Sequence, residues 1–130
     1  MRLIICIAVL LVLLPGQRAS ADARSDFKSA MTHYTDQDYR RAIPLLRRAA
    51  AFAHHGAQYT LGHLHEQGLG VRPNKVLAYM WFAIAAANTN ERAPARRNDV
   101  AKHLTRQQLL DAQRQAIICV DSNYKDCNGP

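Results

Sequence analysis

Apolar and small residues recur at helical spacing along most of this chain of 130 residues. No segment of useful length alternates apolar and polar residues, so the pattern predicts helices and no β-sheet. Glycine, proline and asparagine separate the helical segments, as they commonly do at turns. The predicted helices cover about residues 25–34, 39–52, 57–67, 75–87, 91–103 and 106–119. The predicted fold class is therefore all-α.

The segment 76–87, VLAYMWFAIAAA, carries no charged residue on any side. A helix that is apolar all round needs cover on both flanks, so we expect it at the centre of the fold. Trp81 and Phe82 are its largest expected core anchors. The segment 39–52 differs, because its apolar residues share one arc and its charges share the opposite arc. Four residues form that exposed basic face: Arg40, Arg41, Arg47 and Arg48.

The segment 57–67 is also predicted to have two faces. Three apolar residues are expected to line the core: Ala57, Leu61 and Leu64. Three larger polar residues point the other way: Tyr59, His63 and Glu66. Gly62 costs about 1 kcal/mol in a helix interior, so we expect it to permit the close approach of another helix.

Two helix-forming segments repeat one another. Residues 38–51, DYRRAIPLLRRAAA, align with residues 74–87, NKVLAYMWFAIAAA. Asp38 falls on Asn74, and both are good N-cap residues for the helix that follows. Thr105 with Gln108 forms a capping box for the last helix. The two segments are offset by 36 residues. A repeat of this length indicates a helical solenoid, in which hairpins bury their apolar faces by stacking.

The N-terminus is typical of a secretory signal peptide. Arg2 precedes an apolar run over residues 3–14, and the small residues Ala19, Ser20 and Ala21 follow. A membrane anchor is the alternative, but a spanning helix needs about twenty apolar residues. We predict a signal peptide over residues 1–21, a helical domain over 22–120 and a tail over 121–130. The mature protein then keeps no stable membrane span.

Charge and cysteine content fit an exported protein. The formal net charge is +7, and an exported basic chain rarely meets nucleic acid. Its basic surface is expected to face anionic lipid, cell-wall polymer or an acidic partner. Cys119 and Cys127 are predicted to form a disulfide in an oxidising compartment, with two free thiols as the alternative. The bridge requires the chain to turn between them, which residues 121–123 favour.

Catalytic and metal-binding signals are weak. Ser25 and Lys28 have the S-x-x-K spacing of penicillin-recognising enzymes, but the chain has no Lys-Thr-Gly motif. Ser25 is instead expected to cap a helix. His63 and His65 are two residues apart and face opposite sides of one helix, so a shared metal is not expected. We predict no catalytic residue, no metal site and no cofactor.

The spacing of glycine and alanine in residues 57–88 resembles the Sel1-like repeat, a relative of the tetratricopeptide repeat. The matching residues are Ala57, Leu61, Gly62, Gly68, Gly70 and Val71, followed by Pro73, Ala78, Trp81, Phe82, Ala85 and Ala86. Residues 38–51 resemble the second half of a preceding repeat, and residues 96–116 resemble the closing helices of bacterial members. The family usually has Tyr at the position of His65, which lies near the core arc. There it either packs as the Tyr does or opens a polar gap.

The resemblance implies a right-handed α/α solenoid of about two and a half helix-turn-helix repeats. It also implies a non-catalytic adaptor of the bacterial cell envelope, periplasmic or secreted, that binds a protein partner or forms a weak homo-oligomer. Partners of such folds bind the concave face, which points to Tyr59, His63 and Glu66. Helices 25–34 and 91–103 would continue that groove.

Two other functions remain open in the sequence. Exported cysteine-rich members of the family carry cysteine pairs that staple helices, as Cys119 and Cys127 do by resemblance. Some of those members bind or hydrolyse β-lactams, so a β-lactam-binding or β-lactam-hydrolysing enzyme is the first alternative. The second is a basic envelope-surface binder that uses the arginine face on anionic lipid or cell-wall polymer.

Overall fold

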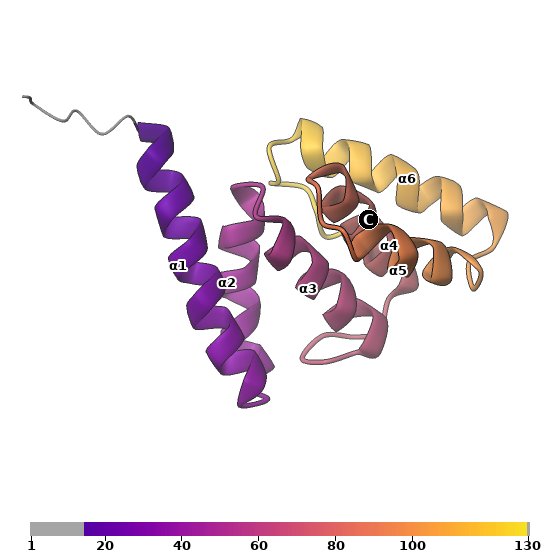
Figure 1. Ribbon diagram of the computed structural model, residues 1–130. Coiled ribbons are helices and arrows are strands. Elements are labelled where there is room, and N and C mark those ends of the chain that lie inside the picture. Colours follow the sequence, from indigo (N-terminus) through magenta and orange to yellow (C-terminus); the bar gives the residue numbers. More distant parts are fainter. Residues whose placement is uncertain (1–14, 130) are drawn as a thin grey trace, which may run out of the picture.

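The computed structural model describes residues 15–129, and the apolar run of the predicted signal peptide lies outside them. Helices and no strands occur in this described part (Figure 1). The elements are α1 (Pro15–Thr35), α2 (Tyr39–Ala51), α3 (His55–Gln67), α4 (Lys75–Ala87), α5 (Ala93–Ala101) and α6 (Arg106–Asp121). The prediction of an all-α helical solenoid is confirmed. None of the described helices is both long and apolar enough to cross a membrane.

Helix starts follow the predicted caps. The backbone N–H of Arg41 donates to the Asp38 carboxylate at 3.3 Å, and that of Leu77 donates to Asn74 Oδ1 at 3.0 Å. Thr105 and Gln108 complete a reciprocal capping box. These side chains satisfy backbone donors that have no partner within the helix. The bounds of α2 and α4 therefore agree closely with those read from the sequence.

Helix α1 is longer than predicted and covers Pro15–Thr35 of the described residues. The alanine, arginine and glutamine residues before Ser25 are adequate helix formers. The predicted cleavage point after Ala21 consequently lies within α1. Ser25 lies in the interior of this helix, so the expectation that it caps a helix is wrong for the chain as described.

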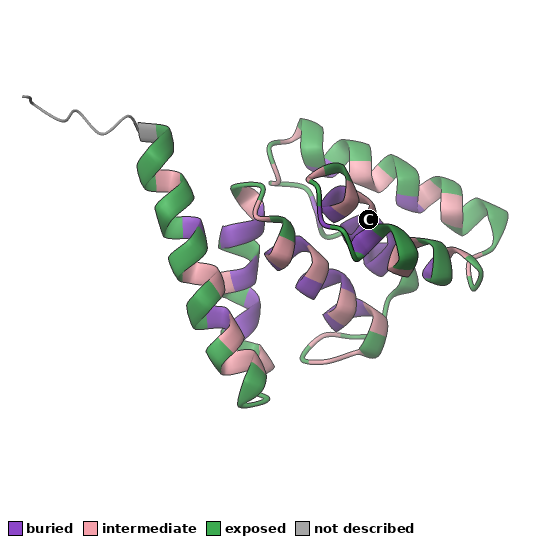
Figure 2. Ribbon diagram, in the orientation of Figure 1, coloured by how far each residue is buried: buried purple, intermediate pink, exposed green. Residues whose placement is uncertain are grey.

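Helix α4 is the most buried element of the fold (Figure 2). Met80 and Phe82 are fully buried, and Trp81 is 4 % exposed. The helix packs against α3 on one side and against α5 and α6 on the other. The first hairpin, α1 and α2, reaches this centre mainly through α3, against which α2 packs. The expected central position of this uncharged helix is thus confirmed.

Helices α3 and α4 approach closely at Gly62. A Cβ atom built on residue 62 would lie 2.7 Å from Cε1 of Phe82, well inside van der Waals contact. Ala57, Leu61 and Leu64 are at most 1 % exposed along the same helix, as predicted. Gly62 is therefore the small residue that lets the Phe82 ring lie against the α3 backbone.

The C-terminal tail folds back on the solenoid. Cys119 and Cys127 are joined in a disulfide, with Cα atoms 4.5 Å apart. The chain reverses between them at Asn123 and Tyr124, which both have positive φ angles. Asn88, at the end of α4, donates to the Tyr124 hydroxyl at 3.3 Å. The predicted turn and bridge are present, and α6 ends two residues later than expected.

We expect Gly62→Ala to destabilise the protein although alanine is the better helix former. The added methyl group must displace Phe82, and overpacking a core typically costs about 1–3 kcal/mol. This exceeds the gain of about 1 kcal/mol in helix propensity. Urea unfolding followed by circular dichroism measures the difference. In Gly62→Ala/Phe82→Leu the second change should relieve part of the loss. Unchanged or increased stability of the single variant would contradict the close contact.

Candidate functional site

A groove lies on the side of α3 that carries two of the predicted contact residues, Tyr59 and His63. Its volume is about 300 Å³. The groove is defined by six lining residues from α1, α3 and the start of α5: Met31, Tyr34, Tyr59, Thr60, His63 and Arg92. Side chains far apart in the sequence are thus brought together, on the three elements that the sequence pointed to.

Aromatic contacts hold the groove wall in place. The centre of the Tyr59 ring lies 5.3 Å from that of the buried Phe82 ring, and the Arg92 guanidinium lies over the Tyr59 ring, 4.6 Å from its centre. The Tyr34 ring lies 6.5 Å from His63. Burial raises the pKa of Tyr34, with smaller contributions from Tyr39 and Tyr59, so its hydroxyl stays neutral. The groove therefore offers ring faces and a hydroxyl whose positions are fixed before any partner arrives.

Glu66 does not line this groove. Its carboxylate accepts two hydrogen bonds from the Arg96 guanidinium, one of them at 2.6 Å, and only 17 % of its side chain is exposed. The hydrogen bond that Arg96 donates to Glu66 is the main reason that the pKa of Arg96 is raised. This pair ties α3 to α5. Of the three predicted contact residues, Glu66 already has a partner within the chain.

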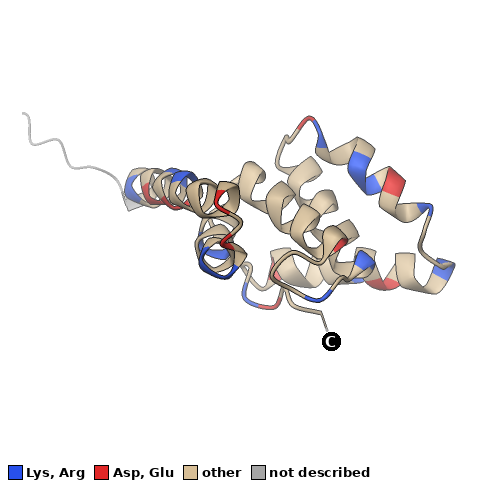
Figure 3. Ribbon diagram, turned by 90° about the horizontal axis from the view of Figure 1, so that it is seen from below, with Lys and Arg blue, Asp and Glu red and all other residues tan. Residues whose placement is uncertain are grey.

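The arginines of α2 are exposed, but they do not form one free basic face. Arg41 pairs with Asp38 at 3.4 Å, and Arg48 pairs with Asp26 of α1. The hydrogen bond to Asp26 is the first cause of the raised pKa of Arg48. Arg40 and Arg47 make no ion pair with any described residue. Figure 3 shows charged residues of both signs along the outer helices, so the positive charge is not gathered on α2 alone.

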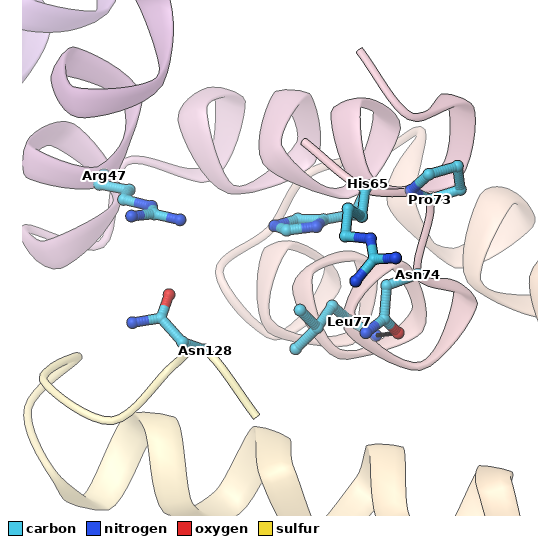
Figure 4. A pocket seen from close by; sticks show the side chains of 7 residues that line it. Arg47, His65, Pro73, Asn74, Leu77 and Asn128 are labelled. Carbon is cyan, nitrogen blue, oxygen red and sulfur yellow. Dashed lines mark hydrogen bonds between the residues drawn. The ribbon is translucent and has the colours of Figure 1, made fainter. Parts of the chain in front are cut away.

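A second and larger cavity lies around His65 and was not predicted (Figure 4). It has a volume of about 690 Å³. We name it the His65 cavity, after the buried histidine among its lining residues: Arg47, His65, Arg72, Pro73, Asn74, Leu77 and Asn128. Replacement of the usual Tyr by His65 was the one signal in the sequence. Of the two alternatives for His65, packing as a tyrosine does or opening a polar gap, the structure shows the polar gap.

His65 is 7 % exposed, and its Nδ1 has no hydrogen-bond partner among the described residues. Burial, with a smaller contribution from the nearby Arg47 guanidinium, lowers the pKa of His65 to about 4. The ring is therefore neutral at pH 7. A buried polar atom without a partner is uncommon in folded proteins, which marks this position as one to explain.

His54 and His55 have local structural roles. His54 caps α3, because its Nδ1 accepts from the Ala57 backbone at 3.2 Å. His55 lies 3.2 Å from Asn90, which joins α3 to the loop after α4. Within residues 15–129 no group of three or more His, Cys, Asp or Glu side chains is arranged to hold a metal ion. Ser25 lies exposed on α1 beside Asp22, Asp26 and Arg48.

Comparison with protein families identifies two adjacent matches. Residues 32–51 and residues 55–90 match the family model of the Sel1 repeat. The first match covers the end of α1 and all of α2, and the second covers α3, α4 and the loop between them. These ranges include the segments 38–51 and 57–88 that resemble the repeat in sequence, whereas the predicted closing helices over 96–116 lie outside them. No curated protein matches the chain.

We expect the stability of the protein to fall in mild acid because of His65. Its pKa is lowered from the ordinary 6.5 to about 4, so between these values the unfolded chain binds a proton that the folded chain does not. Stability contributed by the neutral ring is complete above pH 6.5 and declines as the pH falls toward 4. The loss amounts to at most about 3 kcal/mol.

Chemical unfolding of the wild type and of His65→Tyr, measured between pH 4 and 7.5, isolates this effect. The tyrosine does not titrate in that range, so the variant should show a flatter profile. The two curves should agree near pH 7 if the variant packs in the same way, and they should separate as the pH falls because only the wild type loses stability. Parallel pH profiles for the two proteins would show that His65 does not carry the acid sensitivity.

Proposed function

Because this chain belongs to the Sel1 repeat family, whose repeats generally mediate protein–protein interaction, we propose that it is a non-catalytic adaptor. In this proposal the groove between α1, α3 and α5 binds a segment of a protein partner. The observation that supports it most is the set of fixed aromatic side chains around that hollow. Tyrosine and arginine are enriched where protein interfaces have their strongest contacts.

The geometry favours a partner that inserts one apolar or aromatic side chain. A hollow of about 300 Å³ is of the size of one or two side chains and too small for a folded surface. Met31 and the rings of Tyr34 and His63 surround it, and the hydroxyl of Tyr34 can hydrogen-bond the partner backbone. Because Tyr59 is already packed against Phe82, little side-chain entropy is lost on binding.

We place this adaptor in the bacterial envelope, periplasmic or secreted. Support comes from the signal-peptide pattern of residues 1–21 and from the disulfide between Cys119 and Cys127. Disulfides persist in oxidising compartments and are rare where thiols are kept reduced. Both features support the proposed location only, and the proposed role of the groove does not depend on them.

Variants in the groove should weaken partner capture. We expect His63→Ala and Tyr34→Ala to reduce affinity roughly tenfold each, since removing one interface anchor typically costs more than 1 kcal/mol. Tyr59 is left intact, because its packing on Phe82 would confound binding with folding. Crosslinking from envelope extracts, followed by binding measurements on the isolated partner, gives the affinities.

Ile117→Ala is the matched control, because Ile117 is 62 % exposed on α6 and does not line the groove. It should bind as the wild type does. Thermal unfolding confirms that each variant is folded. A partner that binds all three variants with equal affinity would rule out the groove as its site.

A further inference from the structure

We infer that the His65 cavity is a second binding site, which takes a small organic dianion such as a dicarboxylate or a phosphate monoester. This site is distinct from the groove, since the two share no lining residue. The inference does not depend on the proposed adaptor function. It rests on the charges, the buried histidine and the construction of the cavity walls.

The walls of the cavity come from four separate parts of the chain. Arg47 belongs to α2, His65 to α3, Asn74 to the start of α4 and Asn128 to the tail. In Figure 4 the side chains of Arg47 and His65 point toward one another across the opening, and Asn128 approaches from the tail. Polar groups that converge from several elements onto one hollow are typical of ligand sites.

The charge of the cavity is positive and unbalanced. No acidic residue is among its lining residues, and neither Arg47 nor Arg72 forms an ion pair with any described residue. Asn74 caps α4, so the positive end of that helix dipole also lies at this cavity. Two guanidinium groups match a doubly charged oxyanion, because each can hold an oxygen pair through parallel hydrogen bonds.

His65 supplies a neutral donor to the same space. Its Nδ1 is buried without a partner, and a buried N–H with no acceptor is the costlier of the two tautomeric choices. The proton therefore resides on Nε2, the nitrogen farther from the backbone. The ring extends away from α3 into the cavity, so this N–H can donate to an oxyanion held by Arg47 (Figure 4).

The size of the cavity indicates an organic anion in place of a bare inorganic ion. Its volume of about 690 Å³ is within the range of small-molecule sites. Pro73 and Leu77 give it an apolar wall that can contact a carbon skeleton. The ligand is therefore a compact organic dianion. Its two negative charges lie either together at one end, as in a phosphate monoester, or one at each end, as in a dicarboxylate.

The disulfide makes this site dependent on oxidation. Asn128 directly follows Cys127, whose bond to Cys119 holds the tail against the solenoid. The next residue, Gly129, lies against α4, because a Cβ on residue 129 would lie 3.4 Å from Leu77. Reduction frees the tail, which removes one wall of the cavity and should weaken binding.

The test is a titration of the oxidised protein with succinate and, separately, with glycerol 3-phosphate, at constant ionic strength set by chloride. Nuclear magnetic resonance follows the ring of His65 and the amide of Asn128. We expect saturable shifts at both residues with at least one probe. The tighter probe distinguishes a carboxylate ligand from a phosphate ligand. Bound anion should also raise the pKa of His65, so affinity should increase as the pH is lowered from 7 to 5.

Arg47→Gln should weaken binding roughly tenfold, as loss of one charge-assisted hydrogen-bond pair does. Arg40→Gln is the matched control, because it removes the same charge from an exposed position of α2 that does not line the cavity. Both arginines are exposed, so neither change should disturb folding. Reduction with dithiothreitol should weaken binding in the wild type.

Either of two results would overturn the inference. One is the absence of saturable shifts at His65 with both probes. The other is an equal loss of affinity in Arg47→Gln and Arg40→Gln, which would show that the anions respond only to the net charge of the protein. Binding that is unaffected by reduction would show that the tail is not part of the site.

Discussion

The contact between Gly62 and Phe82 is the constraint on which the rest of this structure depends. It sets the distance between α3 and α4, because the phenyl ring occupies the space that any larger residue at position 62 would fill. Helix α4 carries no charge beyond its first residue and is buried on several sides, so its position fixes α5 and α6 as well. The same ring also contacts Tyr59, which lies one helical turn before Gly62 on α3. A packing contact in the core thus also shapes the wall of the groove.

A short solenoid has a small hydrophobic core, and in this one a disulfide holds the C-terminal tail against that core. Stacked repeats are stabilised by their neighbours, so terminal helices need another means of cover. Here α6 lies over α4, and the bridge between Cys119 and Cys127 returns the tail to the same region. Cys119 and Cys127 are both buried within the main core. The bridge is therefore part of the hydrophobic core as well as a constraint on the tail.

Local sequence signals predicted the elements well, while long-range contacts decided the sites. The caps at Asp38 and Asn74, the uncharged helix α4 and the role of Gly62 follow from short segments whose physical chemistry is self-contained. The extension of α1 to Pro15 did not, because its residues have only moderate helix propensity and no apolar periodicity. The pairing of Glu66 with Arg96 joins residues thirty positions apart, which no helical pattern reveals. The His65 cavity could not be predicted either, because one of its walls is formed by the folded tail at Asn128.

Helix α3 serves two surfaces of different chemistry, and its sequence shows how they are kept apart. His63 and His65 are two residues apart, so helical geometry directs one toward the groove and the other toward the cavity. Around His63 the neighbours are aromatic, which suits an apolar side chain. Around His65 they are arginines and amides, which suit an anion. Because Gly62 and Phe82 hold this helix rigidly against α4, neither surface can be reshaped without disturbing the core. The groove and the cavity therefore share one support, and their linings give opposite sides of a single helix different chemistry.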